Sequence, residues 1–318
     1  MPEGPILLTG ATGFLGANIA RYFLAEKFSV HTLVRTVSPR WRLRDIRGLQ
    51  FCEAELTDAK AVRAALREIR PMVILHFAAH PALADERDDA AIFFNTVLPL
   101  IHLAHAAAEV GTVEAFINAG SSSEYGFQNV PMREDMLPNP TSVHGVAKYA
   151  QTLYGQYAAR QFNLPLVTLR LFSIYGPFEQ PRRLVPRLMR AALKNIPIQL
   201  SNPQTSRDFT YVDDVIAAVT KCLENPRAHA GAVYNIGTGR QTTLGELVKQ
   251  VENIHGKPIP VLWGQKPPNK WDAPTWVADP TLAKNLLNFC AAVPLPTGLK
   301  LTYQWFTQHI NDYPEYFE

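Results

Sequence analysis

Thr9-Gly10-Ala11-Thr12-Gly13-Phe14-Leu15-Gly16 is the stretch that decides the fold of this chain. It follows a short apolar strand expected at residues 5–8 and leads into a helical pattern at residues 17–26. Gly10 permits a tight turn, Gly13 lets the backbone approach a pyrophosphate, and Gly16 lets the helix pack close to the strand. A second strand, expected at residues 29–34, completes a βαβ unit. We therefore predict a dinucleotide site formed by Gly10, Thr12, Gly13, Phe14, Leu15 and Gly16.

The same alternation of strands and helices continues toward the middle of the chain. Apolar strands are expected at residues 49–52, 72–79 and 113–118, with helices at residues 59–67 and 90–110 between them. This order predicts the α/β class, with a doubly wound parallel (Rossmann) sheet covered on both faces. Ligands of such sheets lie beyond the carboxyl ends of the strands, where the sequence places Ala78 and Ser121.

A histidine and a lysine form the first candidate for chemistry. His144 and Lys148 are four residues apart at the start of an expected helix, so both side chains lie on one face. A nearby cation favours the neutral form of an imidazole, which is one way in which proton-transfer sites are tuned. A solvated polar face at a helix start is the alternative interpretation.

Arg35 indicates which dinucleotide the site prefers. An NAD site usually has an acidic residue at the end of the second strand, where it binds the adenosine ribose. Arg35 at this position would pair with a 2′-phosphate, and Arg40 or Arg42 could assist. The sequence thus favours NADP(H) over NAD, with a solvated arginine at a loop start as the alternative.

Composition excludes several classes of protein. The chain has 318 residues, of which 47% are hydrophobic and 19% charged, and its formal net charge of +3 gives no reason to expect nucleic-acid binding. No apolar run near 18 residues and no signal peptide stand out, so we expect no membrane association and a cytoplasmic location. Three scattered cysteines, Cys52, Cys222 and Cys290, argue against disulfides and against a metal site.

Taken together, the motifs resemble those of the extended short-chain dehydrogenase/reductase family, which contains nucleotide-sugar epimerases, dehydratases and 4-keto reductases. The matching pieces are the glycine stretch of residues 9–16, residues 76–79, Asn95, residues 120–126, 140–148, 169–177, 207–215 and 234–239. The resemblance implies a Rossmann domain at residues 1–173, to which the chain returns at about 208–235. A smaller C-terminal α/β substrate lobe would comprise residues 174–207 and 236–318, with a proline-rich loop at residues 257–274 that holds Trp263 and Trp271.

The resemblance also implies roles for single residues. Ser121 falls at the catalytic serine or threonine position, and Lys148 at the lysine that holds the nicotinamide ribose. Arg207 falls at the arginine that grips the phosphates of the sugar nucleotide. The resemblance further implies a homodimer through the helices that follow Ala90 and His144, and a nucleotide-sugar substrate. The expected cofactor contacts are those of the glycine stretch, Arg35, Ala78 and Lys148, and the expected substrate contacts are Ser122, Ser123, Ser173, Arg183 and Arg207.

His144 is the main departure from the family, whose catalytic residue at this position is a tyrosine. The histidine could replace the tyrosine as proton donor. It could instead position the substrate while Ser121 or water delivers the proton, or the protein could bind its ligand without catalysis. An imidazolium costs more beside oxidised, cationic nicotinamide than beside the neutral reduced ring, so reduction of a carbonyl is easier to accommodate than an epimerase cycle.

Two further departures favour a reductase. Arg35 and Gly120-Ser121-Ser122 resemble enzymes that reduce GDP-4-keto-6-deoxyhexoses, but Ser123 and Arg183 stand where the epimerising members carry cysteine and histidine. Ser173 replaces a common asparagine. We therefore expect an NADPH-dependent reductase of a nucleotide-linked 4-keto-6-deoxy sugar. The alternatives are an NAD-retaining epimerase or dehydratase, and a catalytically silent NADP(H)-binding protein.

Overall fold

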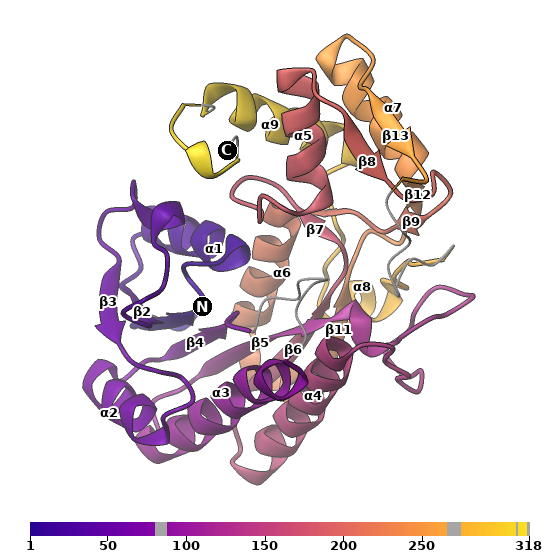
Figure 1. The fold of residues 1–318 in the computed structure, drawn as a ribbon. Helices are drawn as coiled ribbons and strands as arrows, with labels where there is room; N and C mark the ends of the chain where they lie inside the picture. Colours follow the sequence, from indigo (N-terminus) through magenta and orange to yellow (C-terminus); the bar gives the residue numbers. More distant parts are fainter. Residues whose placement is uncertain (80–87, 266–274, 310, 317–318) are drawn as a thin grey trace.

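A seven-stranded parallel sheet forms the centre of the computed structural model, which describes residues 1–79, 88–265, 275–309 and 311–316 (Figure 1). The strand order is β11-β6-β5-β4-β1-β2-β3, and every neighbouring pair is parallel. This order reverses direction beside β1, and it confirms the expected doubly wound α/β fold. The strands are β1 (Ile6–Thr9), β2 (Val30–Val34), β3 (Gln50–Glu53), β4 (Val73–His76), β5 (Ala115–Ser121), β6 (Leu166–Leu171) and β11 (Val233–Ile236).

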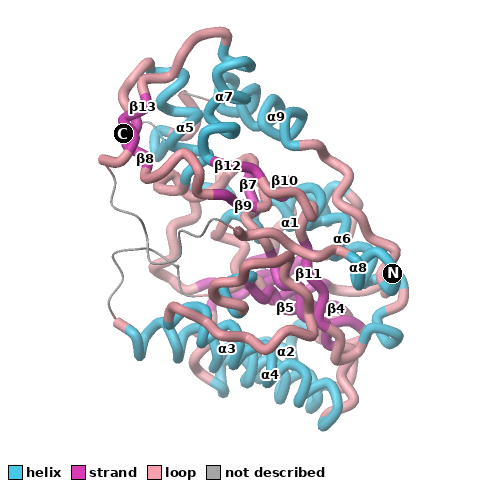
Figure 2. Tube along the Cα trace, turned by 90° about the vertical axis from the view of Figure 1, so that its right-hand side faces the viewer, coloured by secondary structure: helices cyan, strands magenta, loops and turns pink. Residues whose placement is uncertain are grey.

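Helices cover both faces of this sheet. Ile6 and Leu8 of β1 pack into one apolar cluster, which includes side chains from α1 (Phe14–Ala25), α6 (Val212–Glu224) and α8 (Thr281–Leu286). Leu7, between them, packs into a second cluster on the opposite face. That face is covered by α2 (Ala59–Ile69), α3 (Asp89–Val110) and α4 (Val143–Gln161), which lie together below the sheet in Figure 2. Both faces are therefore dry, as a parallel sheet requires.

Among the described residues, α3 is the one helix that is long and apolar enough to cross a membrane by length and composition alone. Half of its most apolar stretch is buried inside the fold. Leu100, Leu103 and Ala107 pack against the sheet in the second cluster. The packing of α3 is that of a core helix.

A second lobe is built beyond the carboxyl ends of the sheet strands. It has its own apolar cluster, to which α5 (Leu184–Lys194), α7 (Leu244–His255) and α9 (Leu295–Gln308) contribute. Its short strand pairs are β7 (Ile174–Tyr175) with β10 (Thr210–Tyr211), β8 (Ile198–Leu200) with β13 (Val261–Trp263), and β9 (Ser206–Arg207) with β12 (Thr242–Thr243).

The chain crosses between the two lobes several times. Between β13 and α9 it returns to the sheet, where Ala283 of α8, with Leu287 and Phe289 after it, joins the first apolar cluster. In the described part of the chain, three 3-10 turns lie between larger elements, namely η1 (Trp41–Leu43), η2 (Ser122–Glu124) and η3 (Pro226–His229), and η4 (Pro314–Tyr316) follows α9. Of the tryptophans expected in the proline-rich loop, Trp263 ends β13, whereas Trp271 lies outside the described residues.

Candidate active site

The glycine stretch forms a closed turn between β1 and α1. Gly10 has a φ of +79°, and a Cβ there would lie 2.6 Å from the amide nitrogen of Ala78. A Cβ on Gly16 would lie 2.1 Å from the carbonyl oxygen of Gly10, so helix and turn touch through glycine alone. The amide of Gly13 donates to Gly10 O at 2.9 Å, and this bond lets α1 begin at Phe14, three residues earlier than the hydrophobic pattern indicates.

The start of α1 fits a dinucleotide. Gly13 is its N-cap and makes no side-chain cap within the described residues, so the N–H groups of the first turn remain available to an anion. Thr12, Phe14 and Leu15 are half-buried around this turn, and Ala78 borders it from the end of β4. The cofactor contacts expected in the glycine stretch and at Ala78 are thus adjacent to one another.

Ser121 and Ser123 mark the carboxyl end of β5. Their hydroxyl groups are 2.8 Å apart, and the amide of Ser121 donates to Glu124 Oε1 at 2.8 Å, which folds the chain into η2. The start of α4 packs directly on this turn, because a Cβ on Gly145 would lie 2.5 Å from Ser123 O. Since His144 precedes Gly145, the structure brings the half-buried imidazole to the same sheet edge as the serines.

Lys148 is buried one helical turn beyond His144. Its Nζ donates to Ala119 O at 2.7 Å and to Gln151 Oε1 at 3.0 Å. Burial lowers the pKa of the ammonium group to about 8, although the charge of Glu124 opposes this shift. The sequence interpretation found the lysine but missed Gln151, whose signal was its position three residues further along the same helix.

Gln151 belongs to a buried chain of hydrogen bonds that the sequence interpretation also missed. Its Nε2 donates to Thr96 O at 2.9 Å and lies 3.2 Å from Nε2 of His76. Nδ1 of His76 lies 2.7 Å from the hydroxyl of Thr9, the last residue of β1. Burial, followed by the charge of Lys148, lowers the pKa of His76 to about 3. A histidine in an otherwise apolar strand was the available signal.

A buried ion pair stabilises the turn formed by Ser121 and η2, here called the serine turn. Glu124 Oε2 accepts from Arg170 Nε at 2.8 Å, and both side chains are almost fully buried. Burial raises the pKa of Glu124 despite the guanidinium beside it. Arg170 also donates to the hydroxyl of Tyr125 at 2.9 Å, and that hydroxyl donates to Asn235 Oδ1 at 2.7 Å. The turn that presents Ser121 is therefore fixed to β6 and β11.

The five residues expected to bind substrate come from four places in the chain: Ser122 and Ser123 from η2, Arg207 from β9, Ser173 from the segment after β6, and Arg183 from the start of α5. Ser122 is buried and its hydroxyl accepts from the indole N–H of Trp276 at 3.1 Å, while the guanidinium of Arg207 lies 5.5 Å from the centre of that indole. Trp276 thus links Ser122 with Arg207. Ser173, whose carbonyl accepts from Thr210 at 3.1 Å, follows β6, and Arg183 is exposed as the N-cap of α5 in the second lobe.

The arginines expected to assist a 2′-phosphate are engaged elsewhere. Arg35 is exposed at the end of β2, but Arg40 pairs with Glu53 at 3.3 Å and stacks over Phe51 at 4.9 Å. Arg42 is buried and donates to Thr12 O, Phe178 O and Gln180 Oε1 at 2.7 to 3.2 Å. These contacts join the glycine turn to the second lobe, so Arg42 has a structural role.

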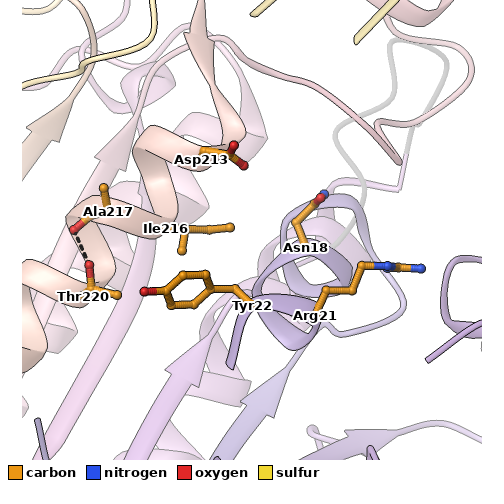
Figure 3. A pocket seen from close by; sticks show the side chains of 7 residues that line it. All are labelled: Asn18, Arg21, Tyr22, Asp213, Ile216, Ala217 and Thr220. Atoms are coloured by element: carbon orange, nitrogen blue, oxygen red, sulfur yellow. Dashed lines mark hydrogen bonds between the residues drawn. The ribbon is translucent and has the colours of Figure 1, made fainter. Parts of the chain in front are cut away.

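A separate groove of about 530 Å³ lies between α1 and α6 (Figure 3). Asn18, Arg21 and Tyr22 line it from α1, and Asp213 and Thr220 are among the residues that line it from α6. It contains none of the residues expected at the active site.

Comparison with known proteins identifies relatives along nearly the whole chain. The model of the NAD dependent epimerase/dehydratase family matches residues 6–237. An uncharacterized UDP-glucose epimerase, YtcB, from Bacillus subtilis (strain 168) is 28% identical over 92% of this chain and 95% of its own. A UDP-glucuronate 4-epimerase from Thermodesulfobacterium geofontis (strain OPF15) is 23% identical over 97% of this chain and 98% of its own.

Solved structures of similar proteins agree. The UDP-glucose 4-epimerase of Thermotoga maritima, crystallised with UDP-glucose, has a TM-score of 0.87 at 28% identity and covers 96% of this chain and 100% of its own. The UDP-glucuronic acid 4-epimerase of Bacillus cereus, in complex with UDP-glucuronic acid and NAD, has a TM-score of 0.85 at 26% identity, with 96% of this chain and 99% of its own covered.

These relatives correct the function expected from the sequence. The expectation of an NADPH-dependent 4-keto reductase is wrong, because these similar proteins are epimerases of UDP-sugars, and the alternative of an NAD-retaining epimerase or dehydratase fits better. The resemblance to the extended short-chain dehydrogenase/reductase type is confirmed. By its sequence along residues 6–237 and by its fold, this chain belongs to the NAD dependent epimerase/dehydratase family.

Proposed function

We propose that this protein is an NAD-dependent 4-epimerase of a UDP-sugar in which His144 moves the proton. The observation that carries this proposal is the contact between Gly145 and Ser123 O, which holds the start of α4 against η2. It supports an arrangement in which His144 and Ser121 act on one hydroxyl of the substrate. The UDP-sugars bound to the similar 4-epimerases support the substrate class.

The residues of the chain have separate tasks in this mechanism. The glycine turn and the start of α1 hold the pyrophosphate of the cofactor, and Lys148 holds the nicotinamide ribose. The nicotinamide, when bound, supplies reversible oxidation and reduction at C4 of the sugar. Nε2 or Nδ1 of His144 takes the proton of the 4-hydroxyl and later returns it, and the hydroxyl of Ser121 donates a hydrogen bond to the same oxygen. Arg207 binds the phosphates of the substrate.

Charge near Lys148 does not favour a reductase over an epimerase. In an epimerase cycle the imidazole of His144 would be neutral whenever a bound nicotinamide is oxidised, because it would take up a proton only as the sugar gives up a hydride. The net positive charge near Lys148 would then be the same in both states, so the electrostatic cost does not distinguish the two directions.

The surroundings of Arg35 support NAD as the cofactor. Glu53 stands opposite Val34 at the adjoining ends of β3 and β2, and its carboxylate neutralises Arg40. A carboxylate here opposes a 2′-phosphate but accepts hydrogen bonds from a ribose diol. NAD is also the nucleotide in the complexes of a similar 4-epimerase.

The activity test uses the purified protein with UDP-glucose and UDP-glucuronate in separate reactions. We expect each active substrate to equilibrate with its 4-epimer, as followed by chromatography, without net consumption of a reduced nucleotide. Substrate deuterated at C4 would return its label to C4. Transfer of the label elsewhere, or binding of both UDP-sugars with no interconversion, would contradict the proposal.

The cofactor test compares nucleotide affinities by calorimetry. We expect the wild-type protein to bind NAD about tenfold or more tightly than NADP, equivalent to about 1.4 kcal/mol. Glu53→Gln removes the carboxylate and releases Arg40, so this preference should narrow or reverse. Glu55→Gln serves as a nearby control for loss of one acidic residue. If the ratio of NAD affinity to NADP affinity is the same in the wild-type protein and in Glu53→Gln, Glu53 does not select the nucleotide.

A further inference from the structure

The orientation of the Gln151 side-chain amide is fixed by its partners, because each partner can face only the amide oxygen or only the amide nitrogen. The protonated Nζ of Lys148 can only donate, so the amide atom 3.0 Å from it is the oxygen. Thr96 O can only accept, so the amide atom 2.9 Å from it is the nitrogen. The same nitrogen lies 3.2 Å from Nε2 of His76, which must then be the unprotonated ring nitrogen.

That assignment settles the tautomer of His76. With Nε2 accepting from Gln151, the ring proton is on Nδ1 and is donated to the hydroxyl of Thr9 at 2.7 Å. The Thr9 hydroxyl also accepts from the amide of Ala78 at 3.3 Å. The chain of bonds thus runs from the end of β1, which carries the glycine turn, through β4 to α4.

Lys148 is held at the other end of this chain. Ala119 O and Gln151 Oε1 use two of the three N–H groups of the ammonium among the described residues, which leaves one for a ligand. Neither acceptor carries a proton to exchange. The buried side of the lysine therefore fixes the position of a charge and offers no path for a proton.

We propose that Gln151, oriented by Thr96 O and hydrogen-bonded to His76, is a positioning residue that ties the ammonium group of Lys148 to the strand end carrying the glycine turn. The charge that meets the nicotinamide ribose and the turn that meets the pyrophosphate are thereby held as one unit across β1, β4 and α4. This inference rests on the proposed function for the role of Lys148, although the positioning itself does not depend on turnover.

The test measures the protonation of Lys148 in the cofactor-free protein by NMR of labelled lysine side chains, with Lys148→Arg to assign the signal. The other charged groups around Lys148 are Glu124 from η2, its partner Arg170 from β6, and the titratable His76 from β4 and His144 from α4. These remain unchanged in the variants. We expect a pKa of about 8 in the wild-type protein.

Two variants of Gln151 should move that pKa in opposite directions. Gln151→Met keeps a side chain of similar length but removes the hydrogen-bond acceptor. It should lower the pKa of Lys148 by about one unit, because the ammonium loses a hydrogen bond. Gln151→Glu places a carboxylate beside the ammonium and should raise it by about one to three units. If Gln151 only fills space, the pKa of Lys148 should shift in one direction or not at all in the two variants. That result would overturn the proposal.

Kinetics give the second readout. In Gln151→Met, kcat should fall about 10- to 100-fold with little change in KM for the UDP-sugar. The basic limb of the pH profile of kcat should shift together with the pKa of Lys148. Gln156→Met on the same helix is the matched control and should leave kcat and the pH profile unchanged. If Gln151→Met does not fold, Gln151→Asn, which withdraws the acceptor, should lower the pKa in the same direction.

Failure of the two proposals can be told apart. Opposite shifts of the Lys148 pKa without any epimerisation by the wild-type protein would support the positioning role and contradict the proposed activity. Epimerisation by the wild-type protein with a Lys148 pKa that is the same in all variants would overturn the positioning role alone.

Discussion

His144 occupies the position at which the family carries its catalytic tyrosine, so its replacement is the sharpest test at the scale of one residue. His144→Phe removes the proton acceptor and should lower kcat about 100- to 10,000-fold, with cofactor affinity unchanged. His144→Tyr should retain measurable epimerisation, because a phenol beside Lys148 can carry the same proton. The measurement is the initial rate of 4-epimer formation.

Tyr149→Phe is the control for the His144 variants, since it alters a half-buried side chain five residues further along the same helix. It should leave the rate within about twofold of wild type. A wild-type rate in His144→Phe would exclude the imidazole and leave Ser121 or water as the proton carrier.

Lys148 makes the stability of the protein depend on pH in a defined direction. The unfolded lysine keeps its proton up to a pKa of 10.5, whereas the folded one releases it at about 8. Between these two pH values the unfolded state binds more protons than the folded state. The free energy of unfolding therefore rises with pH, by about 3 kcal/mol in total from this lysine. Below pH 8 its buried charge opposes folding.

The comparison with Lys148→Met isolates this effect. From about pH 7.5 to about pH 9.5, the free energy of unfolding of the wild-type protein should rise by about 2 kcal/mol relative to that of the variant. Denaturant unfolding at the two pH values measures the difference. A constant difference would mean that Lys148 has the same pKa in the folded and the unfolded protein.

At the scale of elements, the packing of α4 on η2 determines where His144 lies. Gly145→Ala places a methyl group 2.5 Å from Ser123 O, a backbone atom that cannot rotate away. We expect a loss of about 1–3 kcal/mol in unfolding free energy and a fall in kcat of about 10- to 100-fold, because helix and serine turn must separate. Denaturant unfolding and the epimerase assay measure the two effects.

Gly245→Ala in α7 is the matched control for this glycine. Its added methyl group would meet its nearest neighbour at 3.4 Å, an ordinary contact, and alanine favours a helix. It should leave the rate unchanged and the stability equal or higher. A Gly145→Ala protein with the stability and rate of wild type would show that α4 and η2 can separate at no cost.

Most elements of the sheet could be predicted from the sequence because strands such as β1 and β4 are apolar runs bounded by glycine, proline or a helical pattern. The start of α1 could not, since Phe14 and Leu15 carry no signal of the Gly13–Gly10 bond that starts the helix there. The return of α8 to the sheet was also missed. Its contact depends on burial of Ala283 against β11, which no local pattern reveals.

The residues of the candidate site also differ in whether the sequence indicates them. The glycine turn lies in a stretch whose spacing predicts it, and Ser121 and Lys148 lie in stretches that resemble motifs of the family. The sequence does not indicate the roles of Gln151 and His76, because these roles depend on strands and helices that are distant in sequence meeting at one point. The same holds for the cofactor. Arg35 is evident from the sequence and favours NADP(H), whereas the pairing of Arg40 with Glu53 on a neighbouring strand, which supports the proposed preference for NAD, is not evident.

For the whole molecule, the outer surfaces of α3 and α4 support the expected homodimer. They expose large apolar side chains, with Phe94 54% exposed, Leu153 48% and Tyr157 48%. We expect light scattering to give twice the mass of the chain, and Leu153→Glu combined with Tyr157→Glu to give a monomer. Leu301→Glu on α9 is the control and should stay dimeric. A wild-type monomer would contradict this expectation.

The interruption of the sheet by the second lobe has a consequence for synthesis of the protein. β6 ends at Leu171, but its neighbour β11 begins only at Val233, and α6, which covers that face, lies between them. A nascent chain that has reached residue 200 therefore presents an open β6 edge and an uncovered apolar face at the ribosome. Because domains fold as units and bare strand edges invite aggregation, we expect this stretch of translation to be the interval in which the chain most needs a chaperone.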